Sequence, residues 1–408
     1  MRGDCTVLAS LVVRVDLLTR EYPPEVYGGA GVHVAELVRA LRRDIDVRVR
    51  CFGGERDEER VHSYRVPAEL SAANPSIATL GVDLEIAAAT DGADLVHSHT
   101  WYTNLAGHLA SMLHGIPHVV TAHSLEPLRP WKAEQLGGGY RISSWIEQTA
   151  FSSANAIIAV SEGMARDIKR CYPSLDPDKI MVVHNGIDLG RWKPLVDHDL
   201  LRSLGVDPDK PSVVFVGRIT RQKGLPYLLR AAAELPPEVQ LVLCAGSPDT
   251  PGILAEVQAG VAELQKSRDG VVWIERLLSQ PELRAVLSAA TTFVCPSIYE
   301  PLGIVNLEAM ACGAPVVGTA TGGIPEVIDD GVTGRLVPIV QAQDGTGVPL
   351  DPDTFVRDLA QTLNEVLSDP HAAAAMGIQG RARAEREFGW DRISLRTQEI
   401  YRSLLPSL

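Results

Sequence analysis

A twenty-residue stretch in the second half of the chain decides the fold: residues 291–310 read TTFVCPSIYEPLGIVNLEAM. The run from Thr291 to Cys295 has the composition of a buried strand, and the turn Pro301-Leu302-Gly303 precedes a helical pattern. Strand, loop and helix in this order form the repeating unit of an open parallel α/β sheet. Ligands of such sheets bind at the carboxyl ends of the strands. Glu300 in the loop and Glu308 on the helix should therefore face one ligand-binding edge.

The start of this helix is a second feature of the same stretch. The amides of Leu302, Gly303 and Ile304 have no partner within a helix, so they suit an anion such as a phosphate. Two carboxylates beside an anion site are understandable if they accept hydrogen bonds from hydroxyl groups. A ligand that carries both phosphates and hydroxyls, such as a sugar nucleotide, satisfies both conditions.

The bulk composition excludes several classes of partner. Lys plus Arg is 38 and Asp plus Glu is 51, and the net charge of -13 argues against nucleic acid or an anionic membrane. The sequence has no apolar run of the ~20 residues that span a bilayer. Six cysteines without a C-x-x-C pair are typical of reduced core residues, and we expect a cytoplasmic protein.

Strands and helices alternate on both sides of the opening stretch. Strands are predicted at residues 12–18, 46–51, 94–98, 118–122, 156–160 and 180–183, and again at 212–216, 240–244, 271–274, 291–295 and 315–318. The clearest helix is Val32 to Arg43, and residues 353–405 are helical. The polar residues 188–210 are interpreted as a linker. The fold class is therefore α/β: two Rossmann-like, doubly wound domains that face each other across a deep cleft.

Two loops occupy equivalent places in the two predicted domains. Gly28, Gly29 and Gly31 follow the first strand; they suit a phosphate or acceptor site, although a flexible turn would have the same composition. A third glycine at the spacing of the dinucleotide fingerprint is missing. In the second domain, Arg218 and Lys223 flank a strand-to-helix turn, where they can bind phosphate oxygens. The alternative there is an exposed basic loop.

Histidines follow two strands of the first domain. His123 comes directly after the strand at 118–122, where it could donate to a sugar oxygen or simply cap the strand, and the sequence leaves both open. His97 and His99 alternate on the preceding strand. A metal site would need a third ligand, and no spacing supplies one, so we predict no metal.

Taken together, these residues resemble the retaining glycosyltransferases of the two-Rossmann (GT-B) type, family 4, and the related bacterial glycogen synthases. The resemblance runs from about Val12 onward. It implies that Arg218 and Lys223 bind a diphosphate, that Glu300 and Glu308 bind sugar and ribose hydroxyls, and that His123 acts at the sugar. It also implies that Gly28 and Gly29, with the amides of residues 302–304, contact the donor.

The segment Thr19 to His33 is similar to a group of actinobacterial enzymes within this family. That likeness implies a hexosyltransferase that uses ADP-glucose and glucose 1-phosphate to make α-maltose 1-phosphate for glycogen synthesis, as a homodimer. Because Arg218 and Lys223 can neutralise the diphosphate, we expect no cofactor and no metal. The resemblance to the two-Rossmann family implies an acceptor domain at residues 1–190, a donor domain at 191–388, and a C-terminal helix at about 389–408 that packs back on the acceptor domain.

Two alternative functions stay open at this point. A glycogen synthase that elongates an α-1,4-glucan presents the same 4-hydroxyl as acceptor. A sugar-nucleotide 2-epimerase has the same architecture, although the basic pair and the glycine loop favour transfer. Two places depart from the pattern: residues 1–11 precede the first strand, and Asp16 falls inside it, where an apolar residue is expected.

Overall fold

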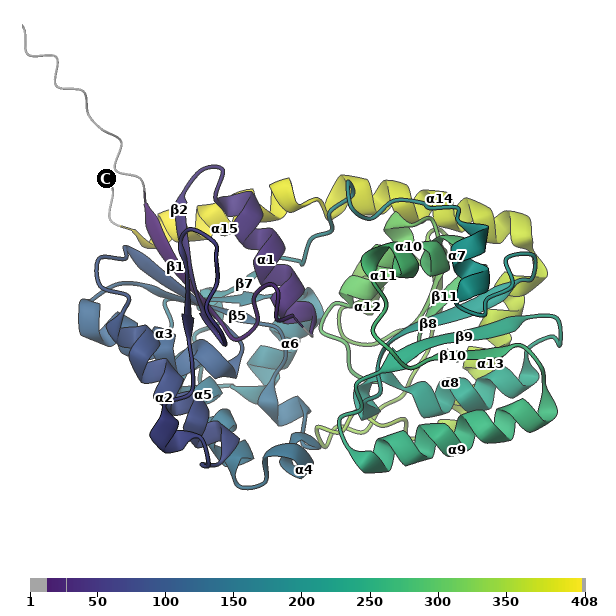
Figure 1. The fold of residues 1–408 in the computed structure, drawn as a ribbon, viewed down its shortest axis with the longest axis horizontal. Coiled ribbons are helices and arrows are strands. Elements are labelled where there is room, and N and C mark those ends of the chain that lie inside the picture. The colour runs from purple at the N-terminus through teal and green to yellow at the C-terminus, as the bar shows by residue number, and fades with distance from the viewer. Residues whose placement is uncertain (1–12, 27, 406–408) are drawn as a thin grey trace, which may run out of the picture.

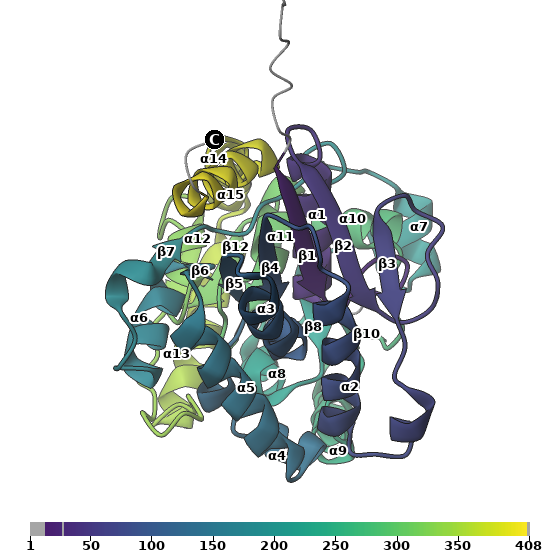
Figure 2. The same cartoon turned by 90° about the vertical axis from the view of Figure 1, so that its left-hand side faces the viewer.

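The computed structural model describes residues 13–26 and 28–405. Its strands form two parallel sheets (Figures 1 and 2). The seven-stranded sheet, in the order β3-β2-β1-β4-β5-β6-β7, contains β1 (Arg14–Thr19), β2 (Asp46–Phe52), β3 (Val61–Tyr64), β4 (Leu95–His99), β5 (His118–Ala122), β6 (Ala156–Ala159) and β7 (Ile180–Val182). The six-stranded sheet, in the order β10-β9-β8-β11-β12-β13, contains β8 (Ser212–Arg218), β9 (Gln240–Gly246), β10 (Val271–Ile274), β11 (Thr292–Cys295), β12 (Val316–Thr319) and β13 (Gly334–Val337).

Fifteen α-helices connect and cover the strands within the described residues. Those associated with the seven-stranded sheet, hereafter the N-terminal domain, are α1 (Gly29–Leu41), α2 (Pro75–Ala88), α3 (Trp101–His114), α4 (Lys132–Leu136), α5 (Gly139–Ser153), α6 (Glu162–Cys171) and α15 (Trp390–Leu404). Those associated with the six-stranded sheet, the C-terminal domain, are α7 (His198–Ser203), α8 (Leu225–Ala231), α9 (Pro251–Ser267), α10 (Gln280–Ala289), α11 (Ile304–Ala311), α12 (Ile324–Val327), α13 (Pro352–Ser368) and α14 (Pro370–Glu387).

Both sheets have the strand order of a doubly wound fold, which confirms the predicted fold class. The order reverses between β1 and β4 in one sheet and between β8 and β11 in the other. Ligands bind at such reversal points, just beyond the carboxyl ends of the strands. The predicted motifs lie at the ends of these strands: the glycine loop comes after β1, Arg218 ends β8 with Lys223 in the loop after it, and Glu300 comes after β11.

The central strands are apolar and fully buried, as parallel strands covered on both faces should be. Val15 and Leu17 of β1 pack with α1 and α15, whereas Leu18 packs with α2 and α3. A larger cluster contains buried residues of both domains, among them Phe151 and Met164 from the first and Tyr299 and Leu302 from the second. The domains therefore share apolar contacts near the Glu300 loop.

Asp16 is a real departure from the apolar pattern of β1, and the structure explains it. Its side chain is completely buried, and its carboxylate binds the Arg50 Nε at 2.5 Å and the Arg14 Nε at 2.9 Å. Arg50 lies on β2, in the strand next to β1. A buried charge is tolerated when it is paired and hydrogen-bonded in this way. Residues 1–11, the other departure, lie outside the described residues.

The chain crosses twice between the domains, at two adjacent places. It leaves the seven-stranded sheet after β7 and returns before α15, and the amide of Ile187 donates to the carbonyl of Phe388 at 2.8 Å. Figure 1 shows α14 and α15, in yellow, running along one side of the molecule from the C-terminal to the N-terminal domain. The α15 helix contacts α1, and the hydroxyl of Tyr401 lies 2.6 Å from Nδ1 of His97.

Four details differ from the sequence-based expectations. The edge strands β3 and β13 were not predicted, because their sequences VHSY and GRLV lack a continuous apolar run. The segment at 188–210 is not only a linker, since it contains α7, whose Leu201 is buried. The helix predicted from Val32 to Arg43 is α1, which begins at Gly29.

No helix among the described residues has the length and apolarity that crossing a bilayer requires.

Candidate active site

The loops after β8 and β11 form one compact unit in the C-terminal domain. Gly224, at the end of the loop that carries Arg218 and Lys223, has φ +66°, and a β-carbon there would collide with the carbonyl of Pro296. The amide of Ile298 donates to the carbonyl of Gln222 at 2.8 Å. Glycine at 224 therefore allows the two loops to touch, and their contact holds the basic pair against the glutamate loop.

Lys223 and Glu300, which the sequence predicted as separate ligand-binding groups, contact each other. The Lys223 Nζ lies 2.6 Å from Oε2 of Glu300, and the hydroxyl of Ser297 donates to the same oxygen at 3.1 Å. Burial acts to lower the pKa of Lys223, and the charge and hydrogen bond of Glu300 act to raise it, with a net pKa above the ordinary lysine value. Lys223 is therefore a fixed positive charge at neutral pH.

Arg218 has a carboxylate partner of its own. The Arg218 Nη1 binds Oδ1 of Asp249 at 2.9 Å. Asp249 lies in the loop after β9, the strand next to β8, and sequence analysis did not single it out. Its position beyond the carboxyl end of a parallel strand was the available signal. Both cations of the predicted phosphate site are thus paired with acids.

The start of α11 faces the same unit. Gly303 caps the helix with φ +89°, and the amides of Leu302, Gly303 and Ile304 donate no hydrogen bond within the described part of the chain. The carboxylate of Glu308, one turn further along α11, has no hydrogen-bond partner among the described residues. Burial raises the pKa of the Glu308 carboxyl to about 7, while Lys223 acts to lower it. The helix start offers donors to an anion, and Glu308 offers an acceptor.

The glycine loop of the N-terminal domain lies opposite this helix start. The amide of Gly28 donates to Oε2 of Glu21 at 2.8 Å, and α1 begins at Gly29. A β-carbon on Gly29 would lie 3.7 Å from Cδ1 of Ile304, the first residue of α11. The two loops that the sequence predicted in separate domains are therefore in close proximity.

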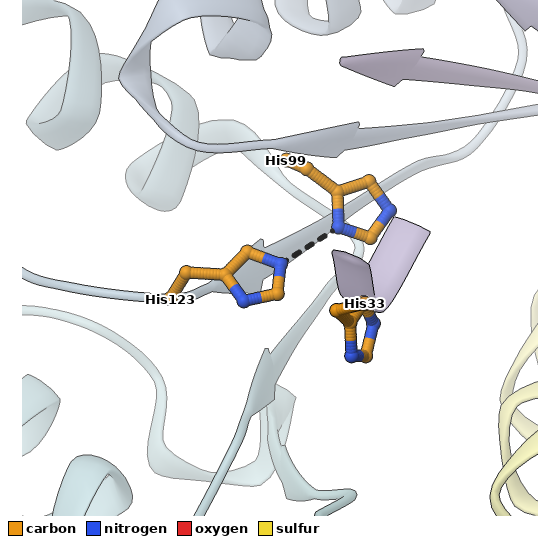
Figure 3. A group of neighbouring side chains, drawn as sticks. All are labelled: His33, His99 and His123. Carbon is orange, nitrogen blue, oxygen red and sulfur yellow. Dashed lines mark hydrogen bonds between the residues drawn. The ribbon is translucent and has the colours of Figure 1, made fainter. Parts of the chain in front are cut away.

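His123, which is half-buried, belongs to a group of three histidines with the buried His33 and His99 (Figure 3). Its Nε2 lies 2.9 Å from Nδ1 of His99 on β4, and His33 from α1 lies beside both rings. One nitrogen from each ring lies within 4.8 Å of the others. His33 and His123 thus join His99, although no spacing in the sequence indicated a third histidine. The ring of His97 lies 4.2 Å from that of His99, but its nitrogens contact Tyr401 and Thr121 and do not face the other two rings.

The three rings are neutral. Burial lowers the pKa of His33 to about 4, with Asn185 acting to raise it, and burial lowers the pKa values of His99 and His123 well below the ordinary histidine value. Neutral imidazoles are also what a metal ion needs, but one pair of these nitrogens is already joined by a hydrogen bond. The prediction of a site without a metal therefore stays a prediction.

Further contacts join the domains beneath Glu300. The hydroxyl of Ser161 donates to the carbonyl of Pro301 at 2.6 Å. The carboxylate of Glu326, on α12, accepts from the amides of Glu162 and Gly163 at the start of α6 and lies 2.9 Å from Nε2 of His184. These residues were not predicted, because the partners are at least 140 positions apart in the chain. They fix the position of the Glu300 loop relative to the N-terminal domain.

A cavity of about 820 Å³ lies elsewhere, between β7, α12 and the junction of α14 and α15. His184, Glu326, Arg383 and Arg392 are among its lining residues. None of the predicted site residues lines it, so we do not assign it to the transfer reaction.

The comparisons with known proteins agree with this geometry. Residues 27–191 match the model described as Glycosyltransferase Family 4, and residues 210–369 match the model described as Glycosyl transferases group 1. The α-maltose-1-phosphate synthase of Mycolicibacterium smegmatis is 54% identical over 395 residues, which cover 96% of this chain and 100% of that protein. The corresponding enzyme of Mycobacterium tuberculosis has the same identity and coverage.

Solved structures support the fold. A sucrose-phosphate synthase from Thermosynechococcus elongatus superimposes with a TM-score of 0.76 at 24% identity and covers 96% of this chain and 99% of its own. The catalytic domain of Arabidopsis thaliana starch synthase IV gives 0.74 at 20% identity, with 96% and 99% covered. The chain belongs to glycosyltransferase family 4 and, within it, to the group that contains the α-maltose-1-phosphate synthases.

Proposed function

We propose that this glycosyltransferase moves glucose from ADP-glucose to the 4-hydroxyl of glucose 1-phosphate, giving α-maltose 1-phosphate and ADP with retention at the anomeric carbon. The observation that carries the proposal is the 54% identity to α-maltose-1-phosphate synthase over the whole of that protein. The carboxylates, cations and helix start assembled after β8 and β11 supply the chemistry that a nucleotide sugar needs.

Donor binding would involve an exchange of partners. A diphosphate placed against Arg218 and Lys223 replaces Asp249 and Glu300 as their anionic partner, and the amides at the start of α11 add donors. Glu300 is then available to accept hydrogen bonds from glucose hydroxyls, and Glu308 from the ribose. Fixed positive charge at the leaving group stabilises the charge that develops there in the transition state, usually the largest single contribution.

The transfer itself is proposed to occur on the front face. A double displacement needs a carboxylate nucleophile beneath the anomeric carbon. Glu300 is the nearest candidate, but its Oε2 is bound by both Lys223 and Ser297, which supports a positioning role. The bond from the anomeric carbon to the acceptor oxygen then forms as the bond to the phosphate oxygen breaks, and the phosphate oxygen takes the acceptor proton.

His123 would donate to a sugar oxygen through Nδ1. Because its Nε2 lies against Nδ1 of His99, a proton on His99 Nδ1 makes Nε2 of His123 the acceptor of that bond. A neutral His123 then carries its own proton on Nδ1. We therefore assign His99 a positioning role that fixes the tautomer of His123.

Location and assembly are proposals of the same kind. The five cysteines in the described part of the chain are free thiols, which supports a reducing, cytoplasmic compartment. A homodimer is expected from the family resemblance, and light scattering of the purified protein tests it.

The decisive experiment identifies donor and acceptor together. The protein is incubated with ADP-glucose or UDP-glucose, and with glucose 1-phosphate or glycogen, and the products are analysed by mass spectrometry. A product with the mass of maltose 1-phosphate, formed from ADP-glucose, is expected. Elongated glucan without that product would instead identify a glycogen synthase.

A further inference from the structure

Lys132 is a buried cation that the proposed donor site does not use. It begins α4 in the N-terminal domain, and only 8% of the residue is exposed. Within the described residues, its Nζ makes no hydrogen bond or ion pair. The Nζ is not among the fully buried polar atoms that lack a partner, so the ammonium lies at the accessible end of a buried stem. A lysine that is held this closely without an ion pair is unusual. The ammonium is therefore available to an anion that comes from outside the chain.

A second basic residue shares an aromatic ring with Lys132. The Lys132 Nζ lies 5.8 Å from the centre of the Tyr102 ring, and the Arg20 guanidinium carbon lies 4.0 Å from the same centre. Arg20 directly follows β1, and Tyr102 lies on the first turn of α3, directly after β4. These are the two strands between which the order of the seven-stranded sheet reverses, so the group lies where ligands of such sheets bind.

The surroundings of Lys132 place it near the donor site but on the opposite domain. Gln135, on the same helix, donates to the carbonyl of Asp249 at 3.1 Å, and Asp249 holds Arg218. Arg218 and Asp249 both act electrostatically on Lys132, as do Arg129 and Glu126 of its own domain. Arg129 already binds the Ser124 hydroxyl at 2.9 Å.

We propose that Lys132, with Arg20 on the same Tyr102 ring, binds the phosphate group of the acceptor sugar. The inference rests on the proposed function and assigns the acceptor subsite within it. The donor diphosphate has its own cations on the C-terminal domain, whereas Lys132 and Arg20 belong to the domain that carries Gly29 and His123. A neutral glucan end offers hydroxyl groups alone and cannot form an ion pair with the ammonium, so this subsite selects a phosphorylated acceptor over a glucan.

The test is the variant Lys132→Met, which keeps the length and apolar stem of the side chain but removes the charge. KM for glucose 1-phosphate should rise about 10- to 100-fold, the effect of one hydrogen bond to a charged group. KM for ADP-glucose should change less than threefold. Lys132→Arg should recover most of the loss. Lys266→Met, at an exposed lysine paired with Glu263, is the matched control and should behave as wild type.

A binding measurement separates this inference from the proposed function. Titration calorimetry with glucose 1-phosphate, in the presence of ADP, needs no turnover and should show the same weakening in Lys132→Met and a smaller one in Arg20→Gln. Arg20→Gln also serves if Lys132→Met does not fold. A wild-type protein that binds glucose 1-phosphate but makes no maltose 1-phosphate would contradict the proposed function alone. Unchanged affinity in the folded variants, or a rise confined to the KM for ADP-glucose, would overturn the assignment of the subsite.

Discussion

The two domains hold positive charge in different ways. In the C-terminal domain, Arg218 and Lys223 each have a carboxylate partner, Asp249 and Glu300. In the N-terminal domain, Lys132 is buried without such a partner among the described residues. The first arrangement keeps its cations charged and compensated before a ligand arrives, so that binding exchanges one anion for another. The second leaves the countercharge to the ligand. Donor binding should therefore depend on an exchange, and acceptor binding on the charge of the acceptor.

The largest expected effect tests the exchange. Arg218→Ala and Lys223→Ala should each lower turnover by at least ~10²-fold, the scale of removing one preorganised donor from a developing charge. Steady-state kinetics with ADP-glucose and glucose 1-phosphate measures this. Turnover near the wild-type rate in either variant would contradict the site.

A double variant sharpens this result. Arg218→Ala leaves the carboxylate of Asp249 unpaired beside the expected diphosphate, so part of the loss should come from repulsion. Adding Asp249→Asn should lower the KM for ADP-glucose by about 3- to 10-fold relative to Arg218→Ala, as expected when a nearby like charge is removed. If the double variant has the same KM for ADP-glucose as Arg218→Ala, or a higher one, Asp249 does not repel the donor diphosphate.

The next effect depends on the charge of Lys132. Burial lowers the pKa of Lys132 to about 8, with Arg129 and Arg218 lowering it further and Glu126 and Asp249 raising it. The free enzyme therefore carries the charge below pH 8 and loses it above. The KM for glucose 1-phosphate should not change with pH up to about pH 8, and above that it should rise by at most about tenfold per pH unit. In Lys132→Arg the rise should disappear, since arginine stays charged.

A smaller effect concerns Glu308, the donor-side acid without a partner. Burial raises its pKa to about 7, from 4.5 in an unfolded chain, so the folded state holds the proton more tightly. The resulting stability is fully present below about pH 4.5 and is lost as the pH rises through 7. Between pH 8 and 6, wild type should gain about 1 kcal/mol of unfolding free energy relative to Glu308→Gln. Urea unfolding at both pH values measures the difference, and parallel pH curves would refute it.

The smallest expected effect is none at all. Because Arg218 and Lys223 can neutralise the diphosphate, EDTA should leave the transfer rate unchanged. The histidine group at His33, His99 and His123 makes this test informative. Full loss of activity in EDTA, restored by added zinc, would falsify the metal-free site.

The sequence was sufficient to predict those elements of the structure that depend on a local pattern of residues. The strands His118–Ala122 and Val271–Ile274 were predicted to the residue, because their largely apolar runs are typical of strands in a parallel sheet. The structure also brings Arg218, Lys223, Glu300 and the start of α11 together, as their positions after strands implied. The roles of these residues stay predictions.

The remaining features depend on partners that lie far apart in the chain. Asp16 looked misplaced because Arg50 is its neighbour only once β1 and β2 pair. Asp249 and Lys132 carry no motif, and their importance is visible only when the two domains meet. The histidine group needs α1, β4 and the loop after β5 side by side, and sequence spacing does not encode that arrangement.

The pairing of the two crossings, where the Ile187 amide meets the Phe388 carbonyl, has a mechanical consequence. Topologically, the C-terminal domain is an insertion into the N-terminal one, and its two ends leave from the same point. The two adjacent crossing segments allow one domain to rotate relative to the other about the line through both segments. Sliding of one segment along the other would break the hydrogen bond between Ile187 and Phe388 and is therefore less favourable. Opening for product release should therefore be a swing about this point, and a disulfide engineered across residues 187 and 389 should leave that swing intact.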